Sequence, residues 1–181
     1  AVWDTIGLVI ADTRRFIEHD PAAEAGLRQY VLRLIEKNYR RLGYKTLPTD
    51  NEEDAKLRAN IFALAVWAEH PDALEHALSQ FHAFTKPSDL PAELRSIIYA
   101  AGARWQGEQA YEKLMSLYKR TSFSEEHRNL ASGMAAARDA NVIRKLLNHL
   151  SDTSIVRLQD TPLWFVYLIR AKYARESAWQ W

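Results

Sequence analysis

Histidine is the first residue type to consider for chemistry, because the chain of 181 residues has six histidines and no cysteine. Without cysteine there is no disulfide, thiolate metal site, redox motif or cysteine nucleophile. Two histidines bind one metal from a single helix when three or four positions separate them. His76 and His82 are six residues apart, which places them about 240° apart around a helix. They point in different directions, and no H-E-x-x-H stretch occurs.

His19-Asp20 resembles the His-Asp pair of an all-α metal-dependent phosphohydrolase. Such a site needs a further histidine upstream, and none of the residues before His19 is a histidine. Asp20 followed by Pro21 is better explained as a helix N-cap with proline at the first helical position. The sequence therefore predicts no metal ligands, and no metal catalysis, within this chain.

Carboxylates and glycines offer no other reaction centre. The acidic runs Glu52-Glu53-Asp54 and Glu125-Glu126 stand at expected helix starts, where the helix dipole favours negative charge. The sequence has neither a glycine-rich phosphate loop nor a G-x-S-x-G nucleophile elbow. We therefore expect a chain without catalytic or cofactor-binding residues of its own.

A basic run from Arg28 to Lys45 raises the alternative of RNA contact, because Tyr30, Tyr39 and Tyr44 are interleaved with its charges. Over the whole chain, 24 Lys and Arg oppose 23 Asp and Glu, for a net charge of +1. Nucleic-acid binding relies on an electrostatic field that this balance does not supply. An ordinary solvated helix face is favoured, with Tyr30 assigned to the apolar side of the helix.

The clearest helical period follows Pro21, where apolar residues recur at the i, i+3, i+4 and i+7 spacing of one face. That face comprises Leu27, Tyr30, Val31, Leu34, Ile35 and Leu42. Gly43 is a natural end for this helix, and the polar stretch 45–54 is the longest candidate loop. The longest apolar runs, 61–68 and 163–169, are far shorter than the roughly 20 residues that a membrane helix needs.

Further helix starts follow at regular intervals, and no strand-like alternation appears. The expected starts are Asp54, Asp72, Leu90, Glu108, Glu125, Ala140 and Pro162. Every second start recurs after about 35 residues, which is typical of helix-pair repeats. We therefore predict an all-α fold of stacked antiparallel helix pairs, a HEAT-like right-handed α-solenoid segment, in one helical-repeat domain over 1–181.

Several short segments, taken in order, resemble the C-terminal helical domain of the aminopeptidase N and endoplasmic-reticulum aminopeptidase family of zinc exopeptidases. The segments are Leu42-Gly43-Tyr44, Leu57-Arg58, Leu90 to Arg95 with Ile98-Tyr99, Tyr111 with Leu114 and Tyr118, Val156 to Asp160, and Ala178-Trp179. Their order and spacing over most of the chain carry the resemblance. One departure is Ala174-Arg175, where the family usually has a glycine in the turn.

The resemblance implies that this chain is an excised part of a larger, non-catalytic C-terminal domain. In such enzymes the zinc ligands, the general-base glutamate and a Gly-x-Met-Glu-Asn motif lie in an upstream catalytic domain, and none of them occurs here. It further implies that this domain caps the active-site chamber and limits or positions the peptide substrate. The implied partners are therefore the upstream catalytic domain and the peptide, with zinc in the parent protein only. The compartment stays open, with a cytoplasmic one favoured if the source is bacterial.

Five residues are structural or interdomain candidates. Arg58 and Arg95 stand early in expected helices, where the dipole opposes a positive charge, so each should face inward or have a carboxylate partner. The resembling segments add Tyr99, Gln159 and Asp160, and Asp160 is expected to cap or brace the helix that follows. The alternative function is a free-standing helical-repeat scaffold that binds a peptide or protein on its concave face.

Overall fold

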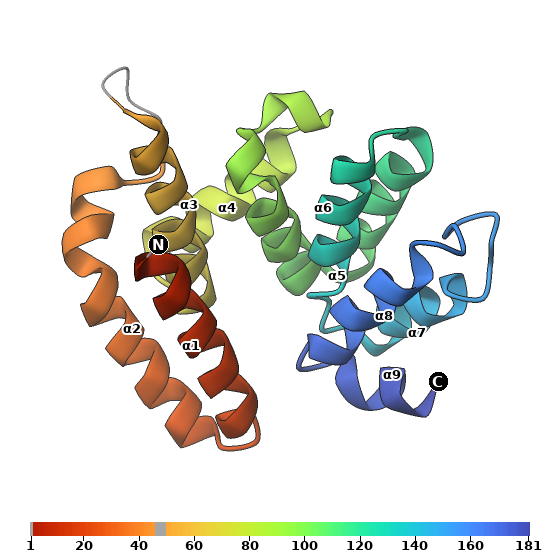
Figure 1. The fold of residues 1–181 in the computed structure, drawn as a ribbon, viewed down its shortest axis with the longest axis horizontal. Coiled ribbons are helices and arrows are strands. Elements are labelled where there is room, and N and C mark those ends of the chain that lie inside the picture. The colour runs from red at the N-terminus through yellow and green to blue at the C-terminus, as the bar shows by residue number, and fades with distance from the viewer. Residues whose placement is uncertain (1, 46–49) are drawn as a thin grey trace. The chain divides into compact units, whose positions relative to one another are not determined.

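The computed structural model describes residues 2–45 and 50–181, and Figure 1 shows its ribbon. Over these residues every regular element is helical, so the predicted all-α class is confirmed. The elements are α1 (Val2–Ile17), α2 (Pro21–Leu42), α3 (Glu52–Trp67), α4 (Pro71–Ala83), the short 3₁₀ helices η1 (Pro87–Asp89) and η2 (Ala92–Leu94), α5 (Arg95–Arg120), α6 (Ser124–Met134), α7 (Ala140–His149), α8 (Thr161–Arg170) and α9 (Arg175–Gln180). Part of the loop expected at 45–54 lies outside the described residues.

Local cap chemistry sets both ends of α2, as the sequence predicted. The Asp20 carboxylate accepts hydrogen bonds from the N–H groups of Ala22 and Ala23, each over 3.0 Å. At the other end Gly43 has φ 55° and donates its N–H to the Tyr39 carbonyl. These contacts satisfy backbone groups that a helix end leaves unpaired.

One expected helix start differs from the structure, and another coincides with a break inside a helix. The start near Leu90 is wrong, because Pro91 takes an extended ψ of 133° and the chain passes through η2 before α5 begins at Arg95. The start at Glu108 falls within α5, directly after Gly107, whose φ of 52° and ψ of −127° interrupt the helical geometry. Glycine adopts this region because it has no Cβ, so the helix changes direction at that residue.

The chain divides into two compact units, 1–76 and 77–181. In the first unit α1 packs against α2 and α3, and α2 packs along α3. The centre of this unit consists of Val31, Ile35, Ile61, Phe62 and Ala65, each no more than 1% exposed. The single domain over 1–181 and the solenoid form stay predictions.

The apolar face of α2 is narrower than its sequence pattern indicates. Val31, Ile35 and Leu42 are buried, but 53% of Tyr30 is exposed. Each helical residue advances by about 100°, so Tyr30 stands about 140° around the helix from Ile35. The assignment of Tyr30 to the buried side is therefore wrong.

In the second unit α5 packs along α6 at very close range. A Cβ built on Gly133 of α6 would lie 2.4 Å from the Cβ of Tyr99 on α5. The two backbones approach this closely only because position 133 has no side chain. Across the described residues, none of the helices has the length and apolar composition that crossing a bilayer requires.

Candidate functional site

Arg58, one of the predicted structural residues, lies on α3 with only 1% of its surface exposed. Its Nε donates to the carbonyl oxygen of Leu42 over 3.1 Å, and its Nη2 to Oδ1 of Asp50 over 2.7 Å. Leu42 is the last residue of α2, and the carbonyls at a helix end have no hydrogen-bond partner within the helix. The Arg58 guanidinium supplies a partner for the Leu42 carbonyl. Arg58 therefore joins the end of α2 to the residues that enter α3.

Arg95 and Tyr99, two further predicted residues, meet at Glu126 on α6. The Tyr99 hydroxyl donates to Oε1 of Glu126 over 2.8 Å, and Arg95 Nη1 lies 3.2 Å from Oε2. Arg95 Nε also donates to the Leu90 carbonyl over 3.4 Å. Burial raises the pKa of Tyr99, and the bond to Glu126 raises it further. The cluster holds α5 and α6 together through a carboxylate that is only 5% exposed.

Glu126 is not among the residues predicted from the sequence, where its position indicates only a negative charge at a helix start. Its position four residues before the fully buried Leu130 places it on the same helix face. That periodicity is the signal that marks Glu126 as an inward-facing residue. Arg58, by contrast, is marked by its own position, since a positive charge in the first turns of a helix calls for a specific partner.

Asp160 and Gln159 lie in the turn before α8. The Asp160 carboxylate accepts a hydrogen bond from Arg157 Nε over 2.7 Å and makes no side-chain bond to the start of α8. The expected side-chain cap is therefore absent, although the Asp160 carbonyl accepts from the N–H of Trp164 over 3.1 Å. Gln159 is exposed.

A shallow pocket adjoins this turn. Trp164 Nε1 donates to the Tyr118 hydroxyl over 3.2 Å, and their rings meet edge to face with centroids 5.2 Å apart. The lining residues are Tyr118, Ser124, His127, Arg128, Ala131, Asp160, Leu163 and Trp164. The Nε2 of His127 lies 3.1 Å from the Tyr118 carbonyl, so the imidazole is already engaged. The lining combines the rings of Tyr118 and Trp164 with the side chains of Asp160, Arg128 and His127.

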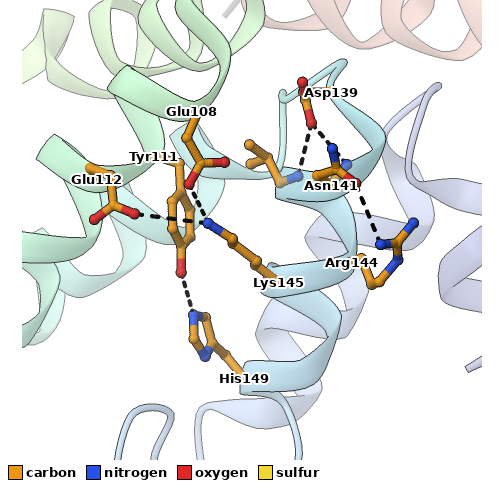
Figure 2. A network of polar contacts seen from close by, with 9 residues as sticks. Glu108, Tyr111, Glu112, Asp139, Asn141, Arg144, Lys145 and His149 are labelled. Atoms are coloured by element: carbon orange, nitrogen blue, oxygen red, sulfur yellow. Dashed lines mark hydrogen bonds and ion pairs between the residues drawn. The ribbon is translucent and has the colours of Figure 1, made fainter.

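A second polar cluster joins α5 to α7 (Figure 2). The Tyr111 hydroxyl lies 2.7 Å from Nε2 of His149, and Lys145 forms ion pairs with Glu108 and Glu112. Burial lowers the pKa of His149, and the nearby Lys119 lowers it further. The cations and carboxylates of this cluster are paired with each other, so it holds two helices together. Sequence reasoning used Tyr111 only for its resemblance and gave His149 no role.

Metal binding by these residues is not supported by their arrangement. Among residues 2–45 and 50–181, no three side chains of His, Asp or Glu gather closely enough to hold an ion. The zinc that the resemblance implies therefore does not fit this part of the chain. No zinc-dependent step is assigned to its residues.

The turn before α9 shows that the departure at Ala174-Arg175 is structurally harmless. Ala174 has φ −97° and ψ −19°, a conformation that any residue adopts, so no glycine is required. Arg175 Nε donates to the Ile169 carbonyl over 3.0 Å, near the end of α8. The side chain at 175 thereby supplies a contact that glycine could not.

Comparison with known proteins gives a consistent set of relatives. The model of the ERAP1-like C-terminal domain matches residues 1–181. Aminopeptidase N of Lactococcus lactis subsp. lactis (strain IL1403) is 28% identical over 175 residues, which is 96% of this chain and 21% of the relative. Aminopeptidase A of Gloydius brevicauda is 24% identical over 183 residues, which is 99% of this chain and 19% of the relative. Glutamyl aminopeptidase of Rattus norvegicus is 29% identical over 127 residues, or 69% of this chain and 13% of the relative.

Proposed function

We propose, from the premise that this chain belongs to the ERAP1-like C-terminal domain family, that it is the non-catalytic part of a larger zinc-dependent aminopeptidase. The parent enzyme would remove N-terminal residues from peptides. In it, this chain would cap the active-site chamber and limit or position the peptide substrate. One observation carries the proposal: the similarity to aminopeptidase N covers 96% of this chain but only 21% of that relative. The zinc ligands and the catalytic glutamate would then lie in the remainder.

The polar clusters support a structural role, as one side of an active-site chamber, rather than a role in the chemical reaction. Arg58 and Glu126 are 1% and 5% exposed, and both bond to groups on neighbouring segments. Hydrogen bonds from buried polar groups hold neighbouring segments in place, and of the Arg58 guanidinium nitrogens Nε and Nη2 make such bonds while Nη1 has no partner. A rigid helical wall can exclude bulky substrates from a chamber without contributing to the chemical step.

The first test is the coding sequence upstream of Ala1. The proposal expects an H-E-x-x-H stretch, a second glutamate further on and a Gly-x-Met-Glu-Asn stretch before it, together with bound zinc in the purified parent protein. An unrelated upstream domain would overturn the peptidase assignment. The free-standing helical-repeat scaffold would then be the leading function.

The second test separates the capping role from the chemistry. The parent enzyme and a version without residues 1–181 are compared for kcat/KM on a single aminoacyl amide and on a long peptide. Loss of the cap should change the ratio of the two kcat/KM values by about tenfold or more, because the chamber then no longer selects substrates by their size. The aminoacyl amide is the internal control, and adding the 181-residue chain back should restore the ratio. An unchanged ratio with intact activity on the small substrate would contradict the capping role.

A further inference from the structure

Helix α1 presents apolar side chains to solvent along one side, which we call its outer face. Its apolar members are Val2, Leu8, Val9 and Phe16, whose exposed fractions are 71%, 68%, 59% and 88%, and the exposed Thr5 and Asp12 lie among them. At about 100° per residue these positions span about 120° of the helix circumference. The largest of them, Phe16, has almost no contact with the rest of the chain.

The opposite side of α1 is also apolar and already has its partners. Ile10 is only 6% exposed, Trp3 and Ile6 are partly buried, and α1 packs against α2 and α3. A helix that is apolar on two sides is typical of a buried helix rather than a surface helix. The outer face of α1 therefore has the composition of a covered surface.

Helix α2 shows how a solvent-facing helix of the same unit is built. Over 33–42 all of its exposed positions carry charges, which are Arg33, Glu36, Lys37, Arg40 and Arg41, whereas Tyr30 earlier in the helix is exposed and uncharged. A terminal helix of a repeat array needs such a polar outer side to stay in water. The outer face of α1 has one charge of its own, Asp12, which pairs with Arg15 at the edge of the face over 2.8 Å.

We infer that the outer face of α1 is covered by an apolar-faced helix from the part of the parent polypeptide that precedes it. This rests on the proposed function, because it takes the chain to be part of a longer aminopeptidase. The matched family is a C-terminal domain, and aminopeptidase N has about four fifths of its length outside the match. Because successive helices usually pack beside one another, the helix before α1 is the nearest candidate. An apolar helix face, rather than a charged ligand, fits a surface of Val, Leu and Phe.

Hydrogen exchange measured on the parent protein and on the 181-residue chain tests this docking. We expect the amides of α1 to exchange at least about tenfold more slowly in the parent, because covering a helix suppresses its local opening. Phe16→Glu should remove that protection in the parent and leave exchange in the short chain unchanged. Phe123→Glu is the matched control, since Phe123 is 76% exposed and remote in sequence, and it should change neither.

Three results would overturn the inference. The first is equal exchange of α1 in the two proteins, and the second is equal effects of Phe16→Glu and Phe123→Glu in the parent. The third is a concentration-dependent dimer of the 181-residue chain in analytical ultracentrifugation that Phe16→Glu dissociates, because the occupant would then be a second copy. If α1 exchanges more slowly in the parent but the parent lacks the zinc ligands and catalytic glutamate of a peptidase, the docking on α1 is supported and the proposed function is wrong.

Discussion

The hydroxyl of Tyr99 on α5 donates a 2.8 Å hydrogen bond to the carboxylate of Glu126 on α6, beside the point where Gly133 lets the two helices meet. The second oxygen of that carboxylate faces Arg95 over 3.2 Å. A carboxylate that is 5% exposed is costly to bury unless charge and hydrogen bonds compensate it. Two donors from one turn of α5 meet this requirement, so they hold α6 in a single register.

Removing Arg95 should therefore destabilise the protein. We expect Arg95→Ala to lower the free energy of unfolding by about 1–3 kcal/mol. This loss is smaller than for a fully buried ion pair, because the Arg95 side chain is 23% exposed and water screens its charge. For a chain of this size that corresponds to a melting temperature lower by roughly 2–12 °C. Arg33→Ala, on the exposed side of α2, is the control. Equal melting temperatures for the two variants would show that Arg95 has no structural role.

The contact beneath Tyr99 gives a prediction for glycine. A methyl group at Gly133 would lie 2.4 Å from the Tyr99 Cβ, so Gly133→Ala must push α5 and α6 apart. The expected loss is about 1–3 kcal/mol of unfolding free energy, measured by urea denaturation. Gly26→Ala on α2 meets nothing within 4 Å and should instead stabilise the helix by roughly 0.5–1 kcal/mol. Similar effects of the two substitutions would contradict the close approach.

Arg58 should be the most sensitive arginine in the first unit. Arg58→Ala removes the partner of both the Leu42 carbonyl and the Asp50 carboxylate from a site that is 1% exposed. Breaking a buried pair in this way costs about 3–5 kcal/mol, which thermal denaturation should register as a fall of roughly 6–20 °C. Arg58→Lys keeps the charge but not the fork of donors, so its loss should be intermediate. If Arg58→Ala lowers the melting temperature no more than Arg33→Ala does, the contacts of Arg58 do not stabilise the first unit.

The Tyr111–His149 contact predicts a loss of stability in mild acid. Burial and Lys119 hold the pKa of His149 below its usual value, whereas in the unfolded chain it is about 6.5. As pH falls below about 6.5, the unfolded state binds more protons than the folded state, so stability declines toward the lowered folded pKa. Urea midpoints at about pH 7.5 and about pH 5.5 should differ less for His149→Gln than for the unmodified chain.

The matched control for that titration is His82→Gln, since His82 is exposed near the end of α4. It should leave the difference between the two urea midpoints unchanged. If His149→Gln also leaves the difference unchanged, the acid sensitivity belongs to other groups. The charged groups that face His149 are Lys119, Lys145 and Asp152, and they would be substituted next.

Features that depend on neighbours in sequence were predictable from the residues alone. Helical periodicity and caps act over three or four positions, so the all-α class, the Asp20 cap and the end of α2 at Gly43 follow from short stretches. The same local signals failed at Leu90, where an extended Pro91 delays the helix to Arg95. The aminopeptidase connection came from resemblance, because composition, periodicity and residue spacing pointed to no particular reaction.

Contacts between residues far apart in the sequence depend on how the helices pack. Tyr99 and Glu126 are 27 positions apart, and Tyr111 and His149 are 38 apart. Neither pair has a spacing that a helix period could reveal, because the crossing of two helices brings its members together. Short stretches of residues were enough to predict most of the helices and the inward tendency of Arg58 and Arg95. Packing decided that Glu126 is buried and that Tyr30 is exposed, since burial depends on how each helix turns toward its neighbours.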